Sequence, residues 1–403
     1  MTVPAASTPA FLTHLSRDRF SPGPDLATIT PEHGLARITS PFGPAWLATR
    51  YEDVRAVLGN SEAFSTAQLA RLQQEQAAAA GSDVPAPDIT GNLVTYDPPG
   101  HTRLRRMLTP EFTIRRMRHI EPRVTEIITA RLDAMAAAGP PADLVESFAL
   151  PVPSLVICEL LGVPYSDRDT FQERAKVQLD FSASAEDRIN ALTQMREYMD
   201  ELVAGKLPHP GDDLLGMLIR EHGSELTATE LAGIAQLLLL AGHETTANML
   251  ATGTLVLLEN PGQLALMRDD PDAVNDAVEE LLRYLSVVQS GLPRSVVAEV
   301  TIGGQDLAPG DLIFSSLPMA NRSPSLADDP GRLDLTRAPS PHVAFGHGIH
   351  HCLGAPLARM EMRAGFPALL RRFPGLRLAV PASEVEFREL TAVHGVRSLP
   401  VAW

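Results

Sequence analysis

Apolar positions recur with a helical period over much of this chain, and the longest such pattern extends from Thr227 to Leu258. Thr227 is followed three residues later by Glu230, a pairing typical of a capping box at a helix start. The most apolar part of the pattern, Leu231 to Gly242, is too short to cross a bilayer. The pattern therefore predicts one long helix that passes through the interior of a globular protein.

The same period predicts further helices on both sides of this segment. They are Tyr51–Leu58, most of His101–Ala204 with a break at Gly139–Pro141, Asp272–Leu285, and a helix from Ala355 to about Arg372. Gly205 and the run Pro208–Gly211 mark an interruption before the long helix. The stretch Gln68–Asn92, rich in Ala, Gln, Gly, Ser and Pro, predicts a mobile loop with a short helix.

Strand patterns are few and lie near the ends of the chain. Leu35–Thr39 and Ala45–Thr49 predict two short strands around a turn, and Val300–Ile302, Gly303-Gly304 and Leu312–Phe314 predict a hairpin. Short strands also finish the chain. We predict a mainly α fold over residues 1–403, treated as one domain, with a small β portion built from the N-terminal, 299–316 and C-terminal segments.

Composition narrows the class of protein. The chain has 403 residues, 44% of them hydrophobic, and a formal net charge of −15, which argues against nucleic acid as a partner. Two cysteines favour a reducing compartment, and Met1–Pro9 lacks the basic and apolar regions of a secretory signal. We therefore expect a soluble cytoplasmic protein with no membrane association.

The strongest chemical signal is the segment Phe345–Gly354, with sequence FGHGIHHCLG. A thiolate at Cys352 needs backbone N–H donors and nearby positive charge, and a helix start just after it favours the ionised sulfur. Gly348 and Gly354 are expected to let the backbone approach the sulfur. A zinc site is the alternative, with the loop histidines as ligands, although structural zinc prefers four ligands in spaced pairs and Cys158 is far away.

The pattern F-x-x-G-x-H-x-C-x-G in this loop resembles the haem-ligand loop of the cytochrome P450 superfamily, and other features look most like its soluble actinobacterial members. The resemblance covers nearly the whole chain. It implies a single-domain P450 fold that holds haem b between the long helix and the helix after the loop. It also implies that Cys352 ligates the iron and that Phe345, Gly348, His350 and Gly354 belong to the haem-binding loop.

A second motif, Ala241–Thr246 with sequence AGHETT, lies midway along the long helix. Gly242 and a threonine hydroxyl that bonds to the preceding turn predict a local bulge, which would expose a carboxylate in an apolar cavity. The motif resembles the family's oxygen-activation signature. That resemblance implies that Thr245 delivers protons and that Glu244 relays them from solvent.

Glu280 and Arg283, at i and i+3, resemble the family's E-x-x-R core, and Arg332 looks like the third member of that ion network. We assign these residues to structural support of the cysteine loop. Asn321–Pro324 resembles the family's A-N-R-D-P turn, with Ser323 in place of the usual Asp.

Two carboxylates can be bound by cationic side chains that project from one helix face, as His101 and Arg105 do at i and i+4. Haem has two propionates. The resemblance adds Arg294 and His350 to a predicted set of propionate-binding residues.

Three segments are placed near the distal haem face by the resemblance, and they lack charge. They supply the predicted pocket residues Leu237, Leu240, Ala241, Val287, Val288, Ser290, Leu292 and Val393. For any one of the apolar residues a place in the core is an equally good interpretation. The set favours a mainly apolar small-molecule substrate of moderate or large size.

The chain carries no flavin or iron–sulfur motif, so electrons are expected from a ferredoxin with a NAD(P)H reductase. Arginines between Arg103 and Arg123, with Arg359 and Arg363, are predicted to form a basic patch that docks the acidic ferredoxin. The expected activity is that of a haem-thiolate monooxygenase that acts as a monomer. A haem peroxygenase and a non-catalytic haem sensor are the alternatives.

Overall fold

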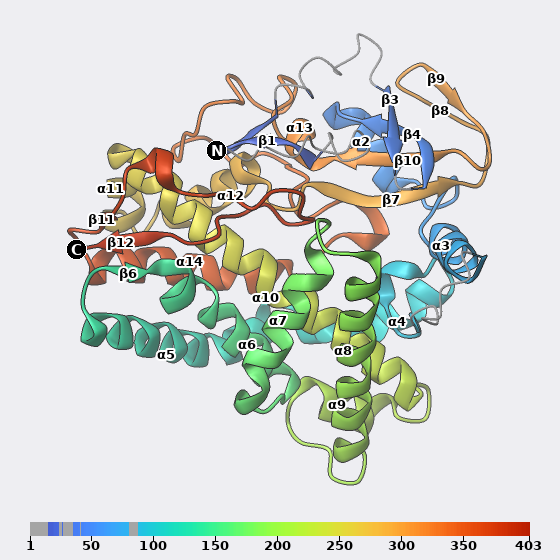
Figure 1. Ribbon diagram of the computed structural model, residues 1–403, viewed down its shortest axis with the longest axis horizontal. Coiled ribbons are helices and arrows are strands. Elements are labelled where there is room, and N and C mark those ends of the chain that lie inside the picture. The colour runs from blue at the N-terminus through green and yellow to red at the C-terminus, as the bar shows by residue number, and fades with distance from the viewer. Residues whose placement is uncertain (1–14, 24–25, 27–34, 41, 80–87) are drawn as a thin grey trace, which may run out of the picture.

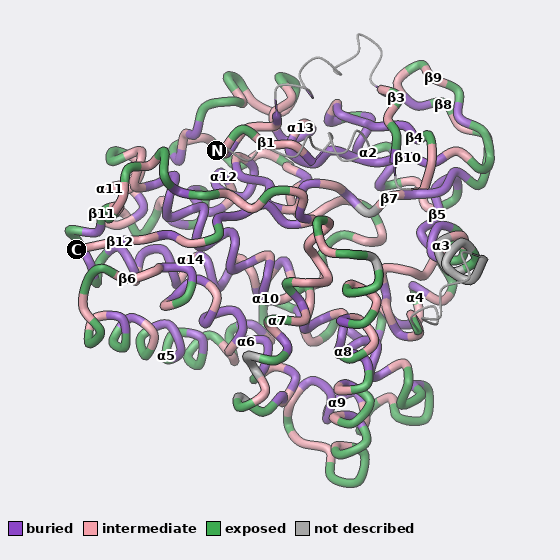
Figure 2. Tube along the Cα trace, in the orientation of Figure 1, coloured by how far each residue is buried: buried purple, intermediate pink, exposed green. Residues whose placement is uncertain are grey.

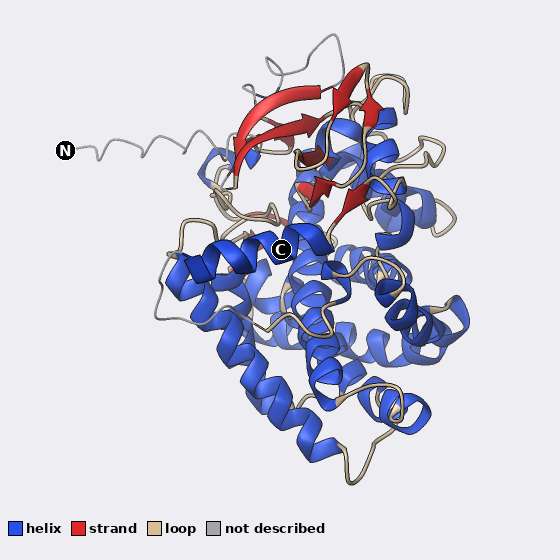
Figure 3. Cartoon of the chain, turned by 90° about the vertical axis from the view of Figure 1, so that its right-hand side faces the viewer, coloured by secondary structure: helices blue, strands red, loops and turns tan. Residues whose placement is uncertain are grey.

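The computed structural model describes residues 15–23, 26, 35–40, 42–79 and 88–403. Figure 1 shows helices stacked through most of the molecule, with the larger sheet along one side. Figure 3 shows the same division from a second direction, with most of the strands at one end of the helical body. The predicted mainly α fold with a small β portion is confirmed.

The helical body contains the longest elements of the chain. Its helices are α4 (Gly100–Leu108), α5 (Ile114–Ala138), α6 (Pro151–Leu161), α7 (Arg168–Leu179), α8 (Ala185–Lys206), α9 (Leu214–His222), α10 (Ala228–Glu259), α11 (Pro261–Asp269), α12 (Val274–Leu285) and α14 (Ala355–Arg372). The helices α2 (Tyr51–Gly59), α3 (Ala67–Ala79) and α13 (Leu317–Ala320) lie beside the sheet. Helix α3 forms the first part of the predicted loop Gln68–Asn92, and residues 80–87 lie outside the described residues.

The larger sheet has the strand order β3-β4-β10-β7-β5, from strands Leu35–Ser40, Gly43–Ala48, Leu312–Ser316, Ser290–Val296 and Phe64–Ser65. Strands β4 and β10 are parallel, and the other neighbours are antiparallel. Three smaller sheets consist of β1 (Arg17–Asp18) with β2 (Ser21–Pro22), β8 (Val300–Ile302) with β9 (Gln305–Leu307), and β11 (Arg377–Leu378), β12 (Pro400–Ala402) and β6 (Ala142–Asp143).

The predicted pairing of 300–302 with 312–314 is wrong. The hairpin closes earlier, with Ile302 opposite Gln305, because Gly303 and Gly304 both adopt positive φ and form a two-residue turn. Residues 312–316 instead form the inner strand β10, which is buried at every position. The apolar run Leu312–Phe314 at its start suits a strand with both faces covered.

Helix α10 organises the helical body. It begins with the predicted capping box, since Thr227 accepts from the backbone of Glu230 and the Glu230 carboxylate accepts from Thr227 N–H. It packs against α6, α8 and α14, and 22 of its 32 residues are buried. Figure 2 shows it running in purple through the middle of the molecule. A helix this long that is buried on all faces positions any polar residue at its midpoint deep inside the protein.

An ion network fixes α12 to the segment that leads to the cysteine loop. Arg283, fully buried, donates to both carboxylate oxygens of Glu280 at 2.7 and 2.8 Å and to the backbone oxygen of Asn321 at 2.8 Å. Asn321 in turn accepts from Val343 N at 2.7 Å. The E-x-x-R pair therefore supports the cysteine loop through Asn321.

The third member of this network is Arg337, whose Nε lies 3.3 Å from Glu280, and the prediction of Arg332 is wrong. The side chain of Arg332 is 60% exposed and pairs with Asp329 and Asp334. Spacing along the chain could not distinguish two arginines five residues apart on one irregular loop.

Candidate functional site

The cysteine loop is a tight turn that ends at the start of α14. Cys352 N donates to the backbone oxygen of Phe345 at 2.9 Å, and His351 N donates to that of Gly348 at 3.0 Å. Gly348 has φ +73°, and a Cβ there would lie 2.3 Å from the backbone oxygen of Leu58 in α2. Gly348 is therefore required by its positive φ and by the close approach of α2.

Gly354 has an ordinary φ of −80°, and a Cβ there would meet no atom of the described protein within 4 Å. The backbone does approach the sulfur here, as predicted, but a side chain at this position would not obstruct that approach. The backbone N–H of Gly354 and that of Ala355 bond to the sulfur of Cys352 and lower its pKa. The space into which a Cβ of Gly354 would project is open.

The Cys352 thiol combines accessibility with desolvation. The residue is exposed, yet surrounding protein raises the pKa of its thiol by desolvation, an effect that the charges of Arg105 and Arg359 oppose. Both observations hold together where a side chain faces an internal space rather than bulk solvent. The sulfur thus points into the molecule at the N-terminal end of α14, where the helix dipole favours an anion.

Four cationic or donor side chains, His101, Arg105, Arg294 and His350, lie near one another beside this space. The rings of His101, in α4, and His350, in the loop, lie 4.4 Å apart between centroids. Burial, followed by the charges of Arg294 and His101, lowers the pKa of His350 to about 3. Burial lowers the pKa of Arg105 as well, and that of Arg294 to about 10.

Two of these four side chains have buried nitrogen atoms without any hydrogen-bond partner in the described protein: Nη1 of Arg294 and Nε2 of His101. Arg294 is only 3% exposed, and His101 is 2% exposed. Buried cationic groups are ordinarily paired, since burying an unpaired charge is costly. The cluster is therefore suited to an anionic group that the protein itself does not supply.

The second predicted motif lies in the middle of α10. Thr245 Oγ1 donates to the backbone oxygen of Ala241 at 2.9 Å, as predicted for a threonine that bonds to the preceding turn. The predicted bulge is absent, because α10 is helical without interruption from Ala228 to Glu259. Ala241 is exposed and Thr245 half-buried in a helix that is otherwise covered, so this face of α10 borders an internal space.

The sequence predicted that Glu244 would be exposed in an apolar cavity, and this prediction is wrong. It is 3% exposed, and its Oε2 accepts from Nη1 of Arg388 at 2.9 Å. Arg388 belongs to the turn near the C-terminus, 144 residues away. Nothing in the local sequence around Arg388 signals this contact.

The predicted pocket residues come from three segments, two of which lie together. Val288 and Val393 form an antiparallel bridge, and His394 N donates to the backbone oxygen of Val287 at 2.7 Å. Leu237, Leu240 and Ala241 are half-buried or exposed positions of α10. Val287 and Val393 belong to the main hydrophobic core, and Ser290 Oγ donates to the backbone oxygen of Gly291. The side chain of Leu292 lies outside what the structure describes.

A small polar cavity of about 90 Å³ opens beside Glu244. Its lining residues are Lys176, Leu179, Asp180, Glu244, Arg388, Glu389, Thr391, Val393 and Arg397. The predicted set lacked charge, whereas this part of the region carries six ionisable side chains. Val393 is the predicted pocket residue that lines it.

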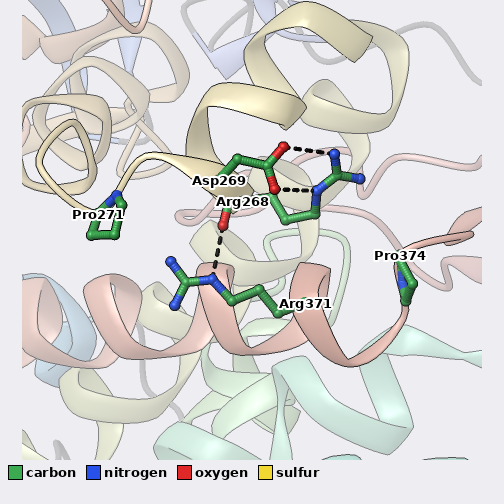
Figure 4. A pocket seen from close by; sticks show the side chains of 5 residues that line it. All are labelled: Arg268, Asp269, Pro271, Arg371 and Pro374. Atoms are coloured by element: carbon green, nitrogen blue, oxygen red, sulfur yellow. Dashed lines mark hydrogen bonds and ion pairs between the residues drawn. The ribbon is translucent and has the colours of Figure 1, made fainter.

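A larger, open groove of about 480 Å³ lies at the far end of α14, between Arg268, Asp269 and Arg371 (Figure 4). Arg268 pairs with Asp269, and Arg371 Nε donates to the backbone oxygen of Arg268 at 2.8 Å. Arg371 is sixteen residues beyond the first residue of α14, which places it about 24 Å along the helix from the cysteine end. The groove is thus remote from the predicted chemistry.

The predicted basic patch is only partly free of acidic partners. Its paired members are Arg103 with Glu230, Arg106 with Glu225, Arg116 with Glu111, Arg123 with Glu159, and Arg359 and Arg363 with Glu279. Arg115 and Arg118 are exposed on α5 and form no ion pair within the part of the chain that the structure describes. The patch reduces to these two arginines and their neighbours.

Among the described residues, no group of three or more His, Cys, Asp or Glu side chains converges on a common point. The zinc alternative, which needs the loop histidines to meet Cys352, is therefore not supported. No helix in the described ranges combines the length and apolar character that a bilayer crossing requires.

The helical body surrounds an accessible cysteine, a threonine hydroxyl on α10 and a cluster of cationic side chains without protein partners. These features define a class of protein that binds a large anionic cofactor. The family model "Cytochrome P450" matches residues 187–386. Cytochrome P450 FAS1 of Rhodococcoides fascians is 45% identical over 394 residues, and the match covers 96% of this chain and 98% of that protein.

Two further proteins are similar to this chain over most of its length. Vitamin D(3) 25-hydroxylase of Pseudonocardia autotrophica is 41% identical, with 94% of this chain and 93% of that protein covered. The crystal structure of CYP105P1 in complex with filipin I matches with a TM-score of 0.89 at 40% identity, covering 96% of this chain and 97% of that one. The chain belongs to the cytochrome P450 family. It is accordingly an oxidoreductase of the monooxygenase type, and its cofactor is haem b.

The residues present fit haem b. The unpartnered nitrogens of Arg294 and His101 suit propionates, and the accessible sulfur of Cys352 suits the iron. Sequence patterns identified these residues but missed Arg337 and Arg388, because both act through contacts between segments distant along the chain.

Proposed function

We propose that this enzyme inserts one atom of O2 into a mainly apolar organic molecule of moderate to large size, with electrons from a ferredoxin and a NAD(P)H reductase. The observation that carries the proposal is the accessible Cys352 thiol, with backbone donors behind it and a cluster of unsatisfied cations beside it. Relatives named as a vitamin D(3) 25-hydroxylase and a nocardicin C N-oxygenase support an oxygenase reaction on a small organic molecule.

In this proposal Cys352 binds the haem iron, and its thiolate is stabilised by Gly354 N–H, Ala355 N–H and the charge of Arg105. The haem, when bound, supplies the oxidising chemistry, and thiolate ligation favours O–O cleavage. The propionates would be held by His101, Arg105, Arg294 and His350. Phe345 supports the loop, since its ring lies 4.5 Å from the Arg359 guanidinium and its carbonyl accepts from Cys352.

Protons would pass from solvent by way of Glu244 and Thr245. Thr245 Oγ1 is anchored to Ala241 on the face of α10 that borders the internal space, so its hydroxyl can exchange a proton there. Glu244, the next residue toward the N-terminus, faces the polar cavity. The two residues together connect solvent with the inner face of α10.

The substrate would bind against Leu237, Leu240 and Ala241 of α10 and against the segments around Val288 and Val393. The backbone bridge between these two segments fixes one wall of the proposed pocket. The charged cavity next to Val393 adds a polar region at one end. A mainly apolar substrate that carries a polar group fits this arrangement better than a hydrocarbon.

The test is to supply purified holoenzyme with a ferredoxin, its reductase and NAD(P)H under labelled oxygen gas, after a spectral binding screen has identified a ligand. A monooxygenase incorporates one labelled atom per product molecule. Product formed from hydrogen peroxide alone at an equal or higher rate would favour the peroxygenase alternative. Binding without any oxidised product under either condition would favour the sensor.

A further inference from the structure

The hairpin of β1 and β2, near the start of the chain, lies against the end of α12 (Figure 1). Arg17 of this hairpin is half-buried, and all three nitrogens of its guanidinium donate hydrogen bonds. Nη2 donates to Ser286 O at 2.7 Å and to Leu285 O at 3.3 Å. Nη1 donates to Phe20 O at 3.4 Å, and Nε donates to Gln289 Oε1 at 3.0 Å. Arg17 therefore binds backbone carbonyls and one side-chain amide.

Ser286 is the residue at which the chain leaves α12 and enters the predicted pocket segment around Val288. It has φ +41°, a left-handed conformation that is uncommon outside glycine. Its carbonyl accepts from Arg17, while its hydroxyl donates to Arg283 O and accepts from Asn321 Nδ2, each at 2.8 Å. These bonds hold the turn, and the turn sets the direction in which the pocket segment begins.

Gln289 connects Arg17 with the second pocket segment. It is 2% exposed, and both ends of its amide are bonded: Oε1 accepts from Arg17, and Nε2 donates to Thr391 O at 2.9 Å. A buried amide whose oxygen and nitrogen both have partners is held in one orientation. Gln289 thus adds a side-chain link to the backbone bridge between Val288 and Val393.

A second contact joins the hairpin to the segment around Val393. Nε2 of His394 lies 2.6 Å from Arg19 O, and His394 N donates to Val287 O at 2.7 Å. The ring of His394 stacks on that of Phe387, with centroids 5.2 Å apart. The hairpin is therefore bonded to both segments of the proposed pocket.

We propose that Arg17 is a positioning residue for substrate binding, which holds the two pocket segments at a fixed separation by way of Gln289. Without the guanidinium, Gln289 Oε1 would be a buried acceptor with no donor, which is costly. Rotation of the amide toward another donor would release Thr391 O, and the two segments would no longer be ordered before a substrate arrives. Ordering them then becomes part of the cost of binding. The inference rests on the proposed pocket and adds a residue outside it that determines how tightly bulky molecules bind.

The test compares a large and a small ligand of the haem iron, clotrimazole and imidazole, in spectral titrations of the purified ferric holoenzyme. Both bind iron through an imidazole nitrogen, but only clotrimazole is large enough to contact the pocket segments. In Arg17→Met we expect clotrimazole to bind about tenfold more weakly, and imidazole to bind as it does to wild type. Arg17→Lys retains a donor for Ser286 O or Gln289 and should lie between wild type and Arg17→Met.

Arg322→Met is the control, because Arg322 anchors the same hairpin through other contacts. Its guanidinium donates to Phe20 O and Ser21 Oγ of the hairpin and to Tyr284 O of α12. Arg322→Met should leave the ratio of the two ligand affinities unchanged at a temperature where the variant remains folded.

A double-mutant cycle tests the route through Gln289. Gln289→Met should weaken clotrimazole binding by a factor similar to that of Arg17→Met. The Arg17→Met, Gln289→Met double variant should bind clotrimazole no more weakly than the weaker single variant, because both substitutions break the same link.

Clotrimazole affinity that is unchanged in Arg17→Met, or lowered equally in Arg322→Met, would overturn the inference. Additive losses in the double variant would contradict it as well, since Arg17 would then not act through Gln289. If Arg17→Met does not retain haem, Gln289→Met decides, and wild-type clotrimazole affinity in that variant would count against the inference. Iron ligation needs no turnover, so a wild-type enzyme that forms no oxidised product would refute the proposed function and leave this comparison valid.

Discussion

Arg294 offers a sharp test of the cationic cluster, because it is buried on strand β7 and one of its nitrogens has no protein partner. Burial lowers its pKa to about 10, which corresponds to a cost of about 3 kcal/mol for holding the charge inside the protein. A propionate would offset that cost. Replacing Arg294 by Met should therefore weaken haem retention while changing the stability of the protein frame little.

The size of the effect follows from the bond that is lost. A hydrogen bond to a charged group contributes about 1.5–3 kcal/mol, so the variant should release haem about 10- to 150-fold more readily. The assay is haem transfer from the holoprotein to an excess of apomyoglobin, followed by absorbance. Circular dichroism on the same samples reports the fold.

Arg322 is the comparison variant, a half-buried arginine whose Nη1 and Nη2 both bond to the protein, although its Nε has no protein partner. It donates to Ser21 Oγ at 3.0 Å, Phe20 O at 2.7 Å and Tyr284 O at 3.3 Å. Arg322→Met should lower the unfolding temperature more than Arg294→Met does, with less effect on haem transfer at a temperature where both remain folded. Equal haem transfer from wild type and Arg294→Met would refute the assignment of Arg294 to a propionate.

Three further outcomes are expected. Thr245→Ala should keep haem and substrate binding but lower the product formed per NAD(P)H by roughly tenfold or more, with peroxide released. The control Thr254→Ala removes a similar hydroxyl–carbonyl bond in α10 and should leave the product yield unchanged. An unchanged product yield in Thr245→Ala would contradict the role of Thr245 in proton delivery. Reversing Arg115 and Arg118 to Glu should slow stopped-flow reduction by an acidic ferredoxin at low salt, and rates insensitive to both charge and salt would exclude docking there. Burial, followed by the charge of Arg17, lowers the pKa of His394 to about 3, so below about pH 6.5 the unfolded chain binds a proton that the folded chain does not, and stability falls as pH falls. His394→Gln should therefore lose less stability than wild type between pH 7 and 5, by up to about 1.4 kcal/mol per pH unit. The same pH dependence of the unfolding free energy in both proteins would contradict this.

Local pattern was sufficient for the features that depend on neighbouring residues. The capping box at Thr227 and Glu230 fixed the start of α10, and the Glu280–Arg283 pair formed as its i, i+3 spacing predicts. The resemblance, rather than periodicity, connected His101 and His350, which lie 249 residues apart and whose tilted rings have centroids 4.4 Å apart.

Features that depend on distant segments could not be predicted in the same way. Arg388 reaches Glu244 only because the C-terminal turn folds over α10, and Arg337 displaces Arg332 because of the course of an irregular loop. Gly348 and Gly354 are positions that the sequence pattern identified without showing their contacts. The pattern identified both correctly as positions of the cysteine loop, but only the structure shows that Gly348 accommodates α2 and that Gly354 supplies an N–H to the sulfur.

The assignment of Cys352 as the iron ligand is tested most directly by the absorbance of the reduced carbon monoxide complex. Wild type should show the red-shifted Soret band of thiolate ligation. Cys352→His should retain haem but lose that band, because Cys158 is buried in α6 and separated from the loop. A Cys158→Ala variant should keep the band. Persistence of the band in Cys352→His would contradict the account.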